Sequence, residues 1–205
     1  MRRHTKPLLS LLTVSMLGSL SCAVFVETPS APATAVVEAP APVVADPDLD
    51  AVLAHLVRHA RRTGLTQGEI DVLARTLVEE ARRHHLDPRL VLAVVHVESR
   101  YDTYAVSDKA AMGLMQILPS TGEWLAGRVG VEWQGPQTLF DPIANVRLGV
   151  AYLRMLLDRY DGNLSAALVA YNWGPAHVDG RLREGGSLPA TYSDLVMRAY
   201  ARRQT

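Results

Sequence analysis

Residues 97–117 read V-E-S-R-Y-D-T-Y-A-V-S-D-K-A-A-M-G-L-M-Q-I and follow the almost unbroken apolar run L-V-L-A-V-V-H-V at residues 90–97. Such a run predicts a buried helix, and Glu98 stands at its end, beside a loop that contains Ser, Gly and Gln. Partial desolvation raises the pKa of a carboxyl, so that it keeps its proton. Glu98 is therefore the predicted general acid. The alternative is a Glu that merely closes a buried helix.

Helix-start signals lie on both sides of this stretch. Asp87-Pro88 and Asp141-Pro142 each place Asp at an N-cap and Pro at the first helical position. Thr66-Gln-Gly-Glu69 has the form of a capping box. We expect the helix that begins at Asp141-Pro142 to run to about Tyr160.

Apolar stripes at helical spacing predict three more helices, over residues 48–62, 164–171 and 189–203. Sustained β alternation is absent, and any strand should be short and lie near residues 111–116. We therefore predict an all-α domain, α+β at most, with a substrate groove and at most a minor β element.

Length and composition favour a globular domain behind an N-terminal segment of different character. The chain has 205 residues, of which 48% are hydrophobic and 20% charged, enough for one core. Its formal net charge is +0, and removal of Arg2, Arg3 and Lys6 with the N-terminal segment would leave it near −3. A basic footprint for nucleic acid is missing, so we expect no nucleic-acid partner.

The first 22 residues have the pattern of an export signal. Arg2, Arg3 and Lys6 precede an uncharged, Leu-rich stretch at residues 8–20. A transmembrane anchor is the alternative, but this stretch is shorter than the roughly 20 apolar residues that span a bilayer. We expect an exported bacterial protein of the periplasm or cell envelope.

Cys22 leaves two ways of processing open. It could carry the lipid of a bacterial lipoprotein and attach the protein to the membrane, or an ordinary signal peptidase could remove it. Residues 23–47 are rich in Ala and Pro and should form an extended linker. Residues 48–75 would then be accessory N-terminal helices, and residues 76–205 the main domain.

Four motifs follow one another in the main domain: Glu98-Ser99, Ala105-x-Ser107, Gly113-Leu-Met-Gln116 with Pro119 and Thr121, and Ala170-Tyr-Asn-Trp-Gly-Pro175. In this order they resemble the lytic transglycosylase domain of the soluble, goose-lysozyme-like (SLT) family, over roughly residues 76–183. Two positions depart from the usual family pattern. Ala110 stands where Gly is usual, and Trp173 stands where a small residue is usual.

The resemblance implies a lysozyme-like helical fold and a peptidoglycan lytic transglycosylase. Its substrate would be the β-1,4 bond between N-acetylmuramic acid and N-acetylglucosamine in glycan strands. Glu98 would act first as acid and then as base, and the product would be a 1,6-anhydromuramoyl end. Carried over by motif, Ser107, Met115, Gln116, Tyr171 and Asn172 would bind substrate, with Tyr171 orienting Glu98 or the N-acetyl group.

Two other functions remain open at this point. A lysozyme-type hydrolase would need a second carboxylate, and Asp102 and Asp108 are near in sequence but have the character of loop or cap residues. A non-catalytic wall-binding protein is the other alternative. A metal site is not predicted, since His55 and His59 lack the intervening Glu of a zinc-protease helix. We expect neither a metal nor a cofactor.

Overall fold

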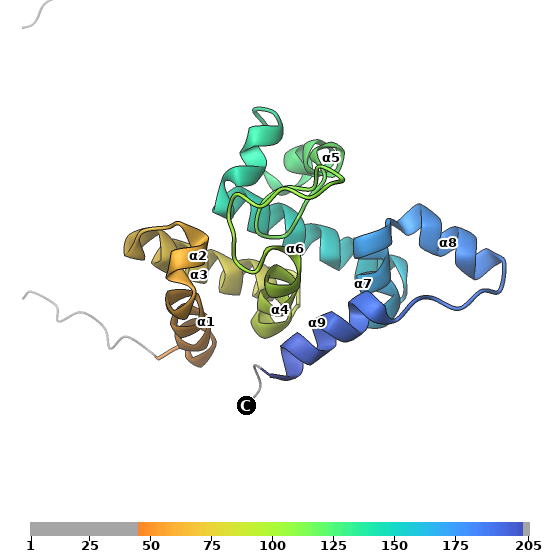
Figure 1. Cartoon of the computed structure of the whole chain (residues 1–205), viewed down its shortest axis with the longest axis horizontal. Helices are drawn as coiled ribbons and strands as arrows, with labels where there is room; N and C mark the ends of the chain where they lie inside the picture. The colour runs from red at the N-terminus through yellow and green to blue at the C-terminus, as the bar shows by residue number, and fades with distance from the viewer. Residues whose placement is uncertain (1–44, 203–205) are drawn as a thin grey trace, which may run out of the picture. The chain divides into compact units, whose positions relative to one another are not determined.

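The computed structural model describes residues 45–202 (Figure 1). The predicted export signal, Cys22 and most of the predicted linker lie outside these residues. Within them the chain forms α1 (Pro47–Arg58), α2 (Ala60–Thr63), α3 (Gln67–Arg83), α4 (Pro88–Ser99), α5 (Pro119–Val129), the 3-10 helix η1 (Pro136–Phe140), α6 (Pro142–Arg159), α7 (Leu164–Trp173), α8 (Pro175–Arg183) and α9 (Thr191–Ala201).

The predicted all-α class is confirmed for the described residues. They form no β-strand, only two isolated bridges that join Met112 to Val106 and to Ile117. The backbone N–H of Met112 donates to the carbonyl of Ile117 at 3.0 Å, and the reverse bond is 3.1 Å long. The short β element expected near residues 111–116 is thus reduced to a single bridged residue.

The predicted helix starts are confirmed by their capping bonds. Asp87 accepts from the backbone N–H of Arg89 at 2.7 Å, and Asp141 caps α6 in the same way. Thr66 and Glu69 form the reciprocal capping box at the start of α3. Each bond satisfies a backbone donor that the first turn of a helix leaves open.

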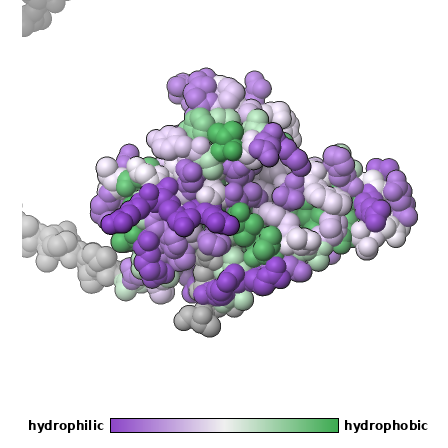
Figure 2. All heavy atoms as spheres, viewed as in Figure 1, coloured by the Kyte–Doolittle hydropathy of each residue, from purple (hydrophilic) through white to green (hydrophobic). Residues whose placement is uncertain are grey.

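Two helices at the centre organise the core. Helix α4 is apolar on nearly all sides, and it packs against α1, α3 and α9. Helix α6 packs against α3, α5 and α7. Helices from both ends of the described residues therefore surround α4, which carries Glu98 in its last turn. Figure 2 shows hydrophilic and intermediate residues over most of one face, with apolar residues in small patches.

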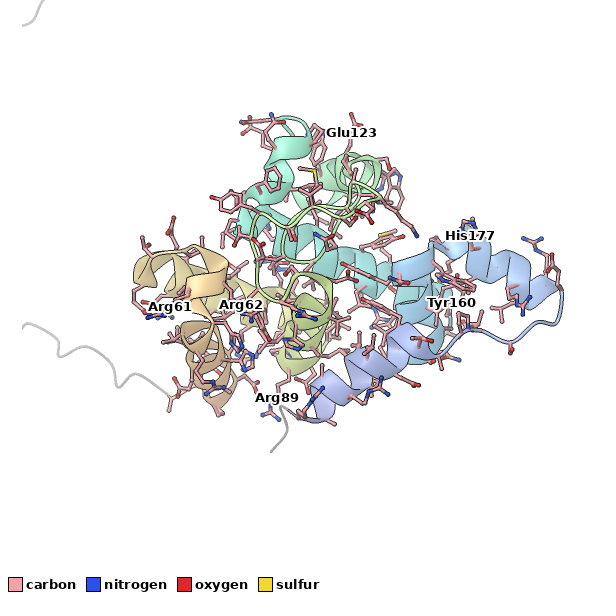
Figure 3. All side chains as sticks on the ribbon, in the orientation of Figure 1. Arg61, Arg62, Arg89, Glu123, Tyr160 and His177 are labelled. Carbon is pink, nitrogen blue, oxygen red and sulfur yellow. The ribbon has the colours of Figure 1, made fainter. Side chains whose placement is uncertain are left out.

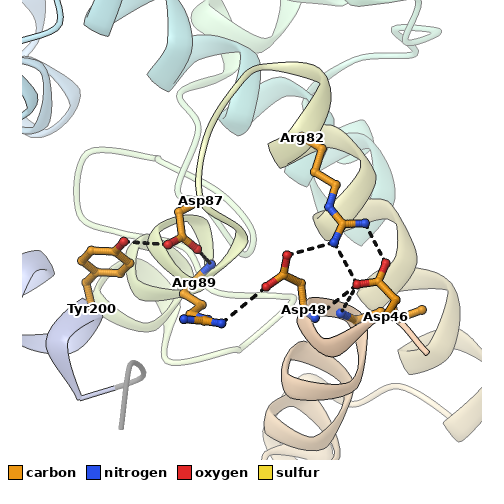
Figure 4. Close-up of polar contacts among 7 residues, drawn as sticks. Asp46, Asp48, Arg82, Asp87, Arg89 and Tyr200 are labelled. Carbon is orange, nitrogen blue, oxygen red and sulfur yellow. Dashed lines mark hydrogen bonds and ion pairs between the residues drawn. The ribbon is translucent and has the colours of Figure 1, made fainter. Parts of the chain in front are cut away.

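Polar contacts fix α1 and α9 to this core (Figure 4). Arg82 of α3 pairs with Asp46 at 2.6 Å and with Asp48 at 2.8 Å. The Tyr200 hydroxyl of α9 donates to Asp87, the residue that caps α4, at 2.6 Å. The same carboxylate therefore begins α4 and receives a hydrogen bond from α9.

Other elements differ from the sequence prediction. The single helix expected over residues 48–62 is two helices, because His59 leaves helical geometry at φ −109° and ψ 11°. Helices α5 and α8 and the 3-10 helix η1 were not predicted. Each begins with Pro, but α5 and α8 contain Gly, which weakens the propensity signal for a helix.

Candidate active site

Glu98 lies in the last turn of α4, at the wall of a hollow of about 330 Å³. The chain leaves the helix abruptly after it, since Arg100 and Tyr101 both adopt positive φ, 51° and 73°. Consecutive left-handed residues without Gly are uncommon and are held only by surrounding structure. The hollow is lined by the four motifs and their neighbours: Glu98, Ser107, Asp108, Lys109, Ala111, Gln116, Leu118, Tyr171 and Asn172.

The carboxyl of Glu98 is set up to hold a proton near neutral pH. Burial raises the pKa of Glu98 from 4.5 to about 7, and a hydrogen bond from the hydroxyl of Tyr192 acts in the opposite direction. Burial and the nearby Glu98 charge raise the pKa of Tyr192 well above its usual value, so its hydroxyl remains a donor. The pair gives an acid that is protonated below about pH 7 and oriented by a neutral group.

Tyr192 is the site residue that sequence reasoning missed. It lies within the helix predicted over residues 189–203, where an aromatic residue at helical spacing has no distinguishing mark. We expected Tyr171 to orient Glu98 or the substrate's N-acetyl group. The Tyr171 hydroxyl donates to the carbonyl of Met115 at 2.9 Å, and its ring contacts Tyr152 with a centroid distance of 5.4 Å, so its part in orienting Glu98 or the N-acetyl group stays a prediction.

The loop between α4 and α5 is held by its own side chains. Ser107 accepts from the backbone N–H of Ala111 at 3.1 Å, and the amide of Gln116 donates to the carbonyls of Ala105 and Gly113, both at 3.0 Å. Ala110 has φ 59° and Gln116 has φ 48°. The position where the family usually has Gly thus does adopt the left-handed conformation in this chain.

Asn145 of α6 supports this loop from beneath. It is fully buried, accepts from the backbone N–H of Met115 at 2.7 Å, and donates to the carbonyls of Met112 and Leu139 at 2.9 and 2.8 Å. A buried amide that makes three bonds fixes backbone groups that would otherwise be unsatisfied. The Asp141-Pro-x-x-Asn145 element therefore positions the loop that lines the hollow.

Met115 differs from its predicted role in substrate binding. Its side chain is fully buried and packs against Gly149 of α6, and it does not line the hollow. The physical reason is the turn at residues 113–116, which aims Met115 inward. Ser107, Gln116, Tyr171 and Asn172 all line the hollow, and substrate contact by these four residues stays a prediction.

The two acidic residues near Glu98 take different positions. Asp102 is exposed and accepts from the backbone N–H of Tyr104 at 2.9 Å, which is the loop role expected of it. Asp108 is also exposed, but it lines the Glu98 hollow. A second carboxylate is therefore present at the rim of the site.

No histidine within residues 45–202 is among the residues that line the hollow. His55 donates to or accepts from the Tyr101 hydroxyl at 2.7 Å, and His59 and His96 pack against the same ring. His177 is on α8, far from α1 and α2 in Figure 3. Within residues 45–202 no three His, Cys, Asp or Glu side chains are grouped to bind a metal ion.

Relatives of the chain are transglycosylases. A "Transglycosylase" of Enterobacteria phage PRD1 is 39% identical over 99 residues, 48% of this chain and 34% of the phage protein. The membrane-bound lytic murein transglycosylase C of Actinobacillus pleuropneumoniae is 34% identical over 127 residues, 56% of this chain and 35% of that protein. The chain thus spans about a third of the length of the curated relatives it matches.

Solved structures of similar fold carry the same kind of name. An inactive Glu-to-Gln mutant of the lytic transglycosylase Slt from Pseudomonas aeruginosa has 26% identity and a TM-score of 0.53, covering 76% of this chain and 28% of that one. The 70 kDa soluble lytic transglycosylase of Escherichia coli has 18% identity and a TM-score of 0.59, covering 75% and 29%, and shows likeness of fold alone.

The transglycosylase SLT domain model matches residues 76–192, more than half of the 205 residues. This range holds Glu98, the loop that Asn145 supports and Tyr192, so the residues that build the hollow are those that the model covers. The resemblance drawn from four motifs is thereby confirmed, and the chain belongs to the transglycosylase SLT domain family.

Proposed function

We propose that the protein is a peptidoglycan lytic transglycosylase in which Glu98 is the catalytic acid and base. The observation that carries the proposal is the partly buried Glu98, whose pKa burial raises to about 7 and whose oxygen accepts the Tyr192 hydrogen bond. An acid with a pKa near the working pH transfers its proton most effectively. Membership in the family and the names of the relatives support the choice of substrate.

The reaction needs one carboxyl acting twice. Glu98 donates its proton to the oxygen between N-acetylmuramic acid and N-acetylglucosamine, and that bond breaks while the N-acetyl group stabilises the cationic sugar. The carboxylate that results then takes the proton of the muramoyl 6-hydroxyl as its oxygen attacks the anomeric carbon. The product is a 1,6-anhydro end, and Glu98 recovers its proton.

The residues around the hollow divide into contact and support. Ser107, Gln116 and Asn172 line it and offer polar groups to the sugars. Tyr192 positions the acid through its hydroxyl, and Tyr171 holds the backbone of Met115, which keeps the Gly113–Gln116 turn in place. Substrate contact by Met115 is not part of this proposal, because its side chain is buried.

A second candidate function is hydrolysis of the same bond in the manner of lysozyme. The presence of Asp108 on the hollow favours it, because a carboxylate opposite the acid could activate water. The products separate the two: transglycosylation leaves anhydro ends, and hydrolysis leaves reducing ends.

The test is digestion of purified sacculi by the wild-type protein, with mass analysis of the released glycan. We expect anhydro ends that disappear in Glu98→Gln and persist in Asp108→Asn. Reducing ends that depend on Asp108 would establish the hydrolase. Binding to sacculi without release by either wild-type or variant protein would identify a wall-binding protein.

We also propose the remaining organisation read from the sequence. Residues 1–22 would direct export, residues 23–47 would act as a spacer, and residues 48–75 would buttress a domain at residues 76–205. The protein would then act in the periplasm or cell envelope, with Cys22 either lipidated or removed. None of the described helices is long and apolar enough to cross a membrane. Mass measurement of the mature N-terminus decides between the two forms of processing.

A further inference from the structure

A second hollow, of about 420 Å³, lies next to the Glu98 hollow, and Asn172 lines both. Trp173, the last residue of α7, stands at its wall with 43% of its surface exposed. The rest of the lining comes from the same helix, from the start of α9 and from the connection before α9: Val169, Asn172, Pro189, Thr191, Tyr192 and Leu195. Leu195 is 45% exposed, so two large side chains present apolar surface to this space.

The Trp173 hollow and the Glu98 hollow share a wall. Asn172 lines both, and Tyr192 lines the Trp173 hollow while its hydroxyl bonds Glu98. A chain-like ligand whose cleaved bond lies at Glu98 could therefore extend from one hollow into the other.

The backbone that carries Trp173 is fixed by α7 and by the junction of α7 with α8. Trp173 belongs to α7, and the N–H of Gly174 behind it donates to the carbonyl of Ala170 at 2.8 Å. Tyr160 then ties the start of α8 to the end of α6, because its hydroxyl donates to Asp179 at 3.0 Å and to the carbonyl of Pro175 at 3.3 Å. Ligand binding at Trp173 therefore requires no ordering of the backbone that carries it.

The lining of the Trp173 hollow is free of charged side chains, whereas Asp108 and Lys109 line the Glu98 hollow. An ionised ligand group would leave water in the Trp173 hollow without gaining a counter-charge. A neutral sugar ring meets no such cost. Its C–H face can pack on an indole ring, and its hydroxyl and N-acetyl groups can bond Asn172 and Thr191.

We propose that Trp173 is the stacking platform of a subsite for a neutral N-acetylhexosamine unit next to the cleaved bond. The inference rests on the proposed function and deepens it. Because Trp173 stands where the family usually has a small residue, this platform is a feature of this chain and would increase its affinity for longer glycan segments.

Binding is measured by calorimetry on the full chain carrying Glu98→Gln, with the N-acetylglucosamine tetramer as probe. Adding Trp173→Ala should weaken binding about threefold to tenfold, and Trp173→Phe should restore part of it. Trp124→Ala is the matched control, because Trp124 is 45% exposed and its hollow shares no residue with the Glu98 hollow. We expect the control to bind like the parent.

A sugar-free L-Ala-D-Glu peptide tests the competing occupant, a charged peptide stem. The inference would be overturned if the protein bound this peptide, Trp173→Ala weakened that binding, and tetramer binding stayed unchanged. It would also be overturned if Trp124→Ala lost as much tetramer affinity as Trp173→Ala. Digestion of sacculi by the wild-type protein separates this inference from the proposed function. Glycan release by the wild-type protein together with unchanged tetramer binding in Trp173→Ala refutes only the subsite, whereas no release by the wild type refutes the function itself.

Discussion

The hydroxyl of Tyr192, near the start of α9, donates a hydrogen bond to Glu98, at the end of α4, across 94 positions of sequence. The bond unites the first and last parts of the family domain at the predicted catalytic acid. It also opposes burial in setting the pKa of Glu98, so the two residues together determine the pH at which the acid loses its proton.

Replacing Tyr192 by Phe should move the alkaline limb of the activity profile to higher pH. The Tyr192 hydrogen bond lowers the pKa of Glu98. Without this bond burial acts alone, the pKa rises, and Glu98 stays protonated to a higher pH. The check is kcat/KM for glycan release from about pH 4 to about pH 9. Tyr200→Phe, on the same helix but bonded to Asp87, should leave the limb near pH 7. A limb that moves to lower pH in Tyr192→Phe would contradict this account.

Glu98→Gln should stabilise the fold at alkaline pH while removing activity. Burial raises the pKa of Glu98 from 4.5 in the unfolded chain to about 7. Proton binding by Glu98 therefore makes its full contribution to the free energy of unfolding below about pH 4.5, and this contribution is lost as the pH rises through about 7. Above that range the variant should be more stable than wild type by roughly 3 kcal/mol, and near pH 4 the two should match.

Urea unfolding at both pH values measures the difference. Glu79→Gln, at an exposed position of α3, controls for the loss of a carboxyl as such. An advantage of Glu98→Gln that is equal at both pH values would mean that proton binding by Glu98 is not its cause.

Gly149→Ala should destabilise the protein by about 1–3 kcal/mol through overpacking. A methyl group at Gly149 would lie 2.4 Å from the sulfur of Met115 and 2.7 Å from its Cβ, so Met115 and the loop that carries it must shift. Gly127→Ala in α5 meets nothing within 4 Å, and there alanine should stabilise by about 0.5–1 kcal/mol. Denaturant midpoints that change in the same direction for both variants would contradict the close contact.

Ala110→Gly should stabilise the loop beside the hollow by about 0.5–1 kcal/mol. Ala110 has φ 59°, a conformation in which a Cβ is strained and glycine is not. Ala111→Gly is the control, because Ala111 is not among the residues with positive φ and glycine there only adds freedom to the unfolded chain. The midpoint temperature of thermal unfolding should be higher than that of the wild type for Ala110→Gly and lower for Ala111→Gly.

Several features of this protein could be predicted from the sequence because they depend on neighbours along the chain. Asp87-Pro88, Asp141-Pro142 and the Thr66–Glu69 box began helices where expected, since capping bonds span only two or three residues. The apolar run at residues 90–97 placed Glu98 at the end of a buried helix for the same reason. The ordered motifs indicated the family, which the domain model confirmed.

The contacts that build the site could be decided only by the tertiary structure, because they join residues far apart in sequence. Helical spacing assigns Tyr192 to a buried face, but only the packing of α9 against α4 brings its hydroxyl to Glu98. The turn at Gly113–Gln116 sends Met115 into the core instead of the hollow, because Asn145 and Gly149 of α6 fix its backbone and side chain. Residue type and local pattern determined which groups were available, and long-range packing determined which of them meet.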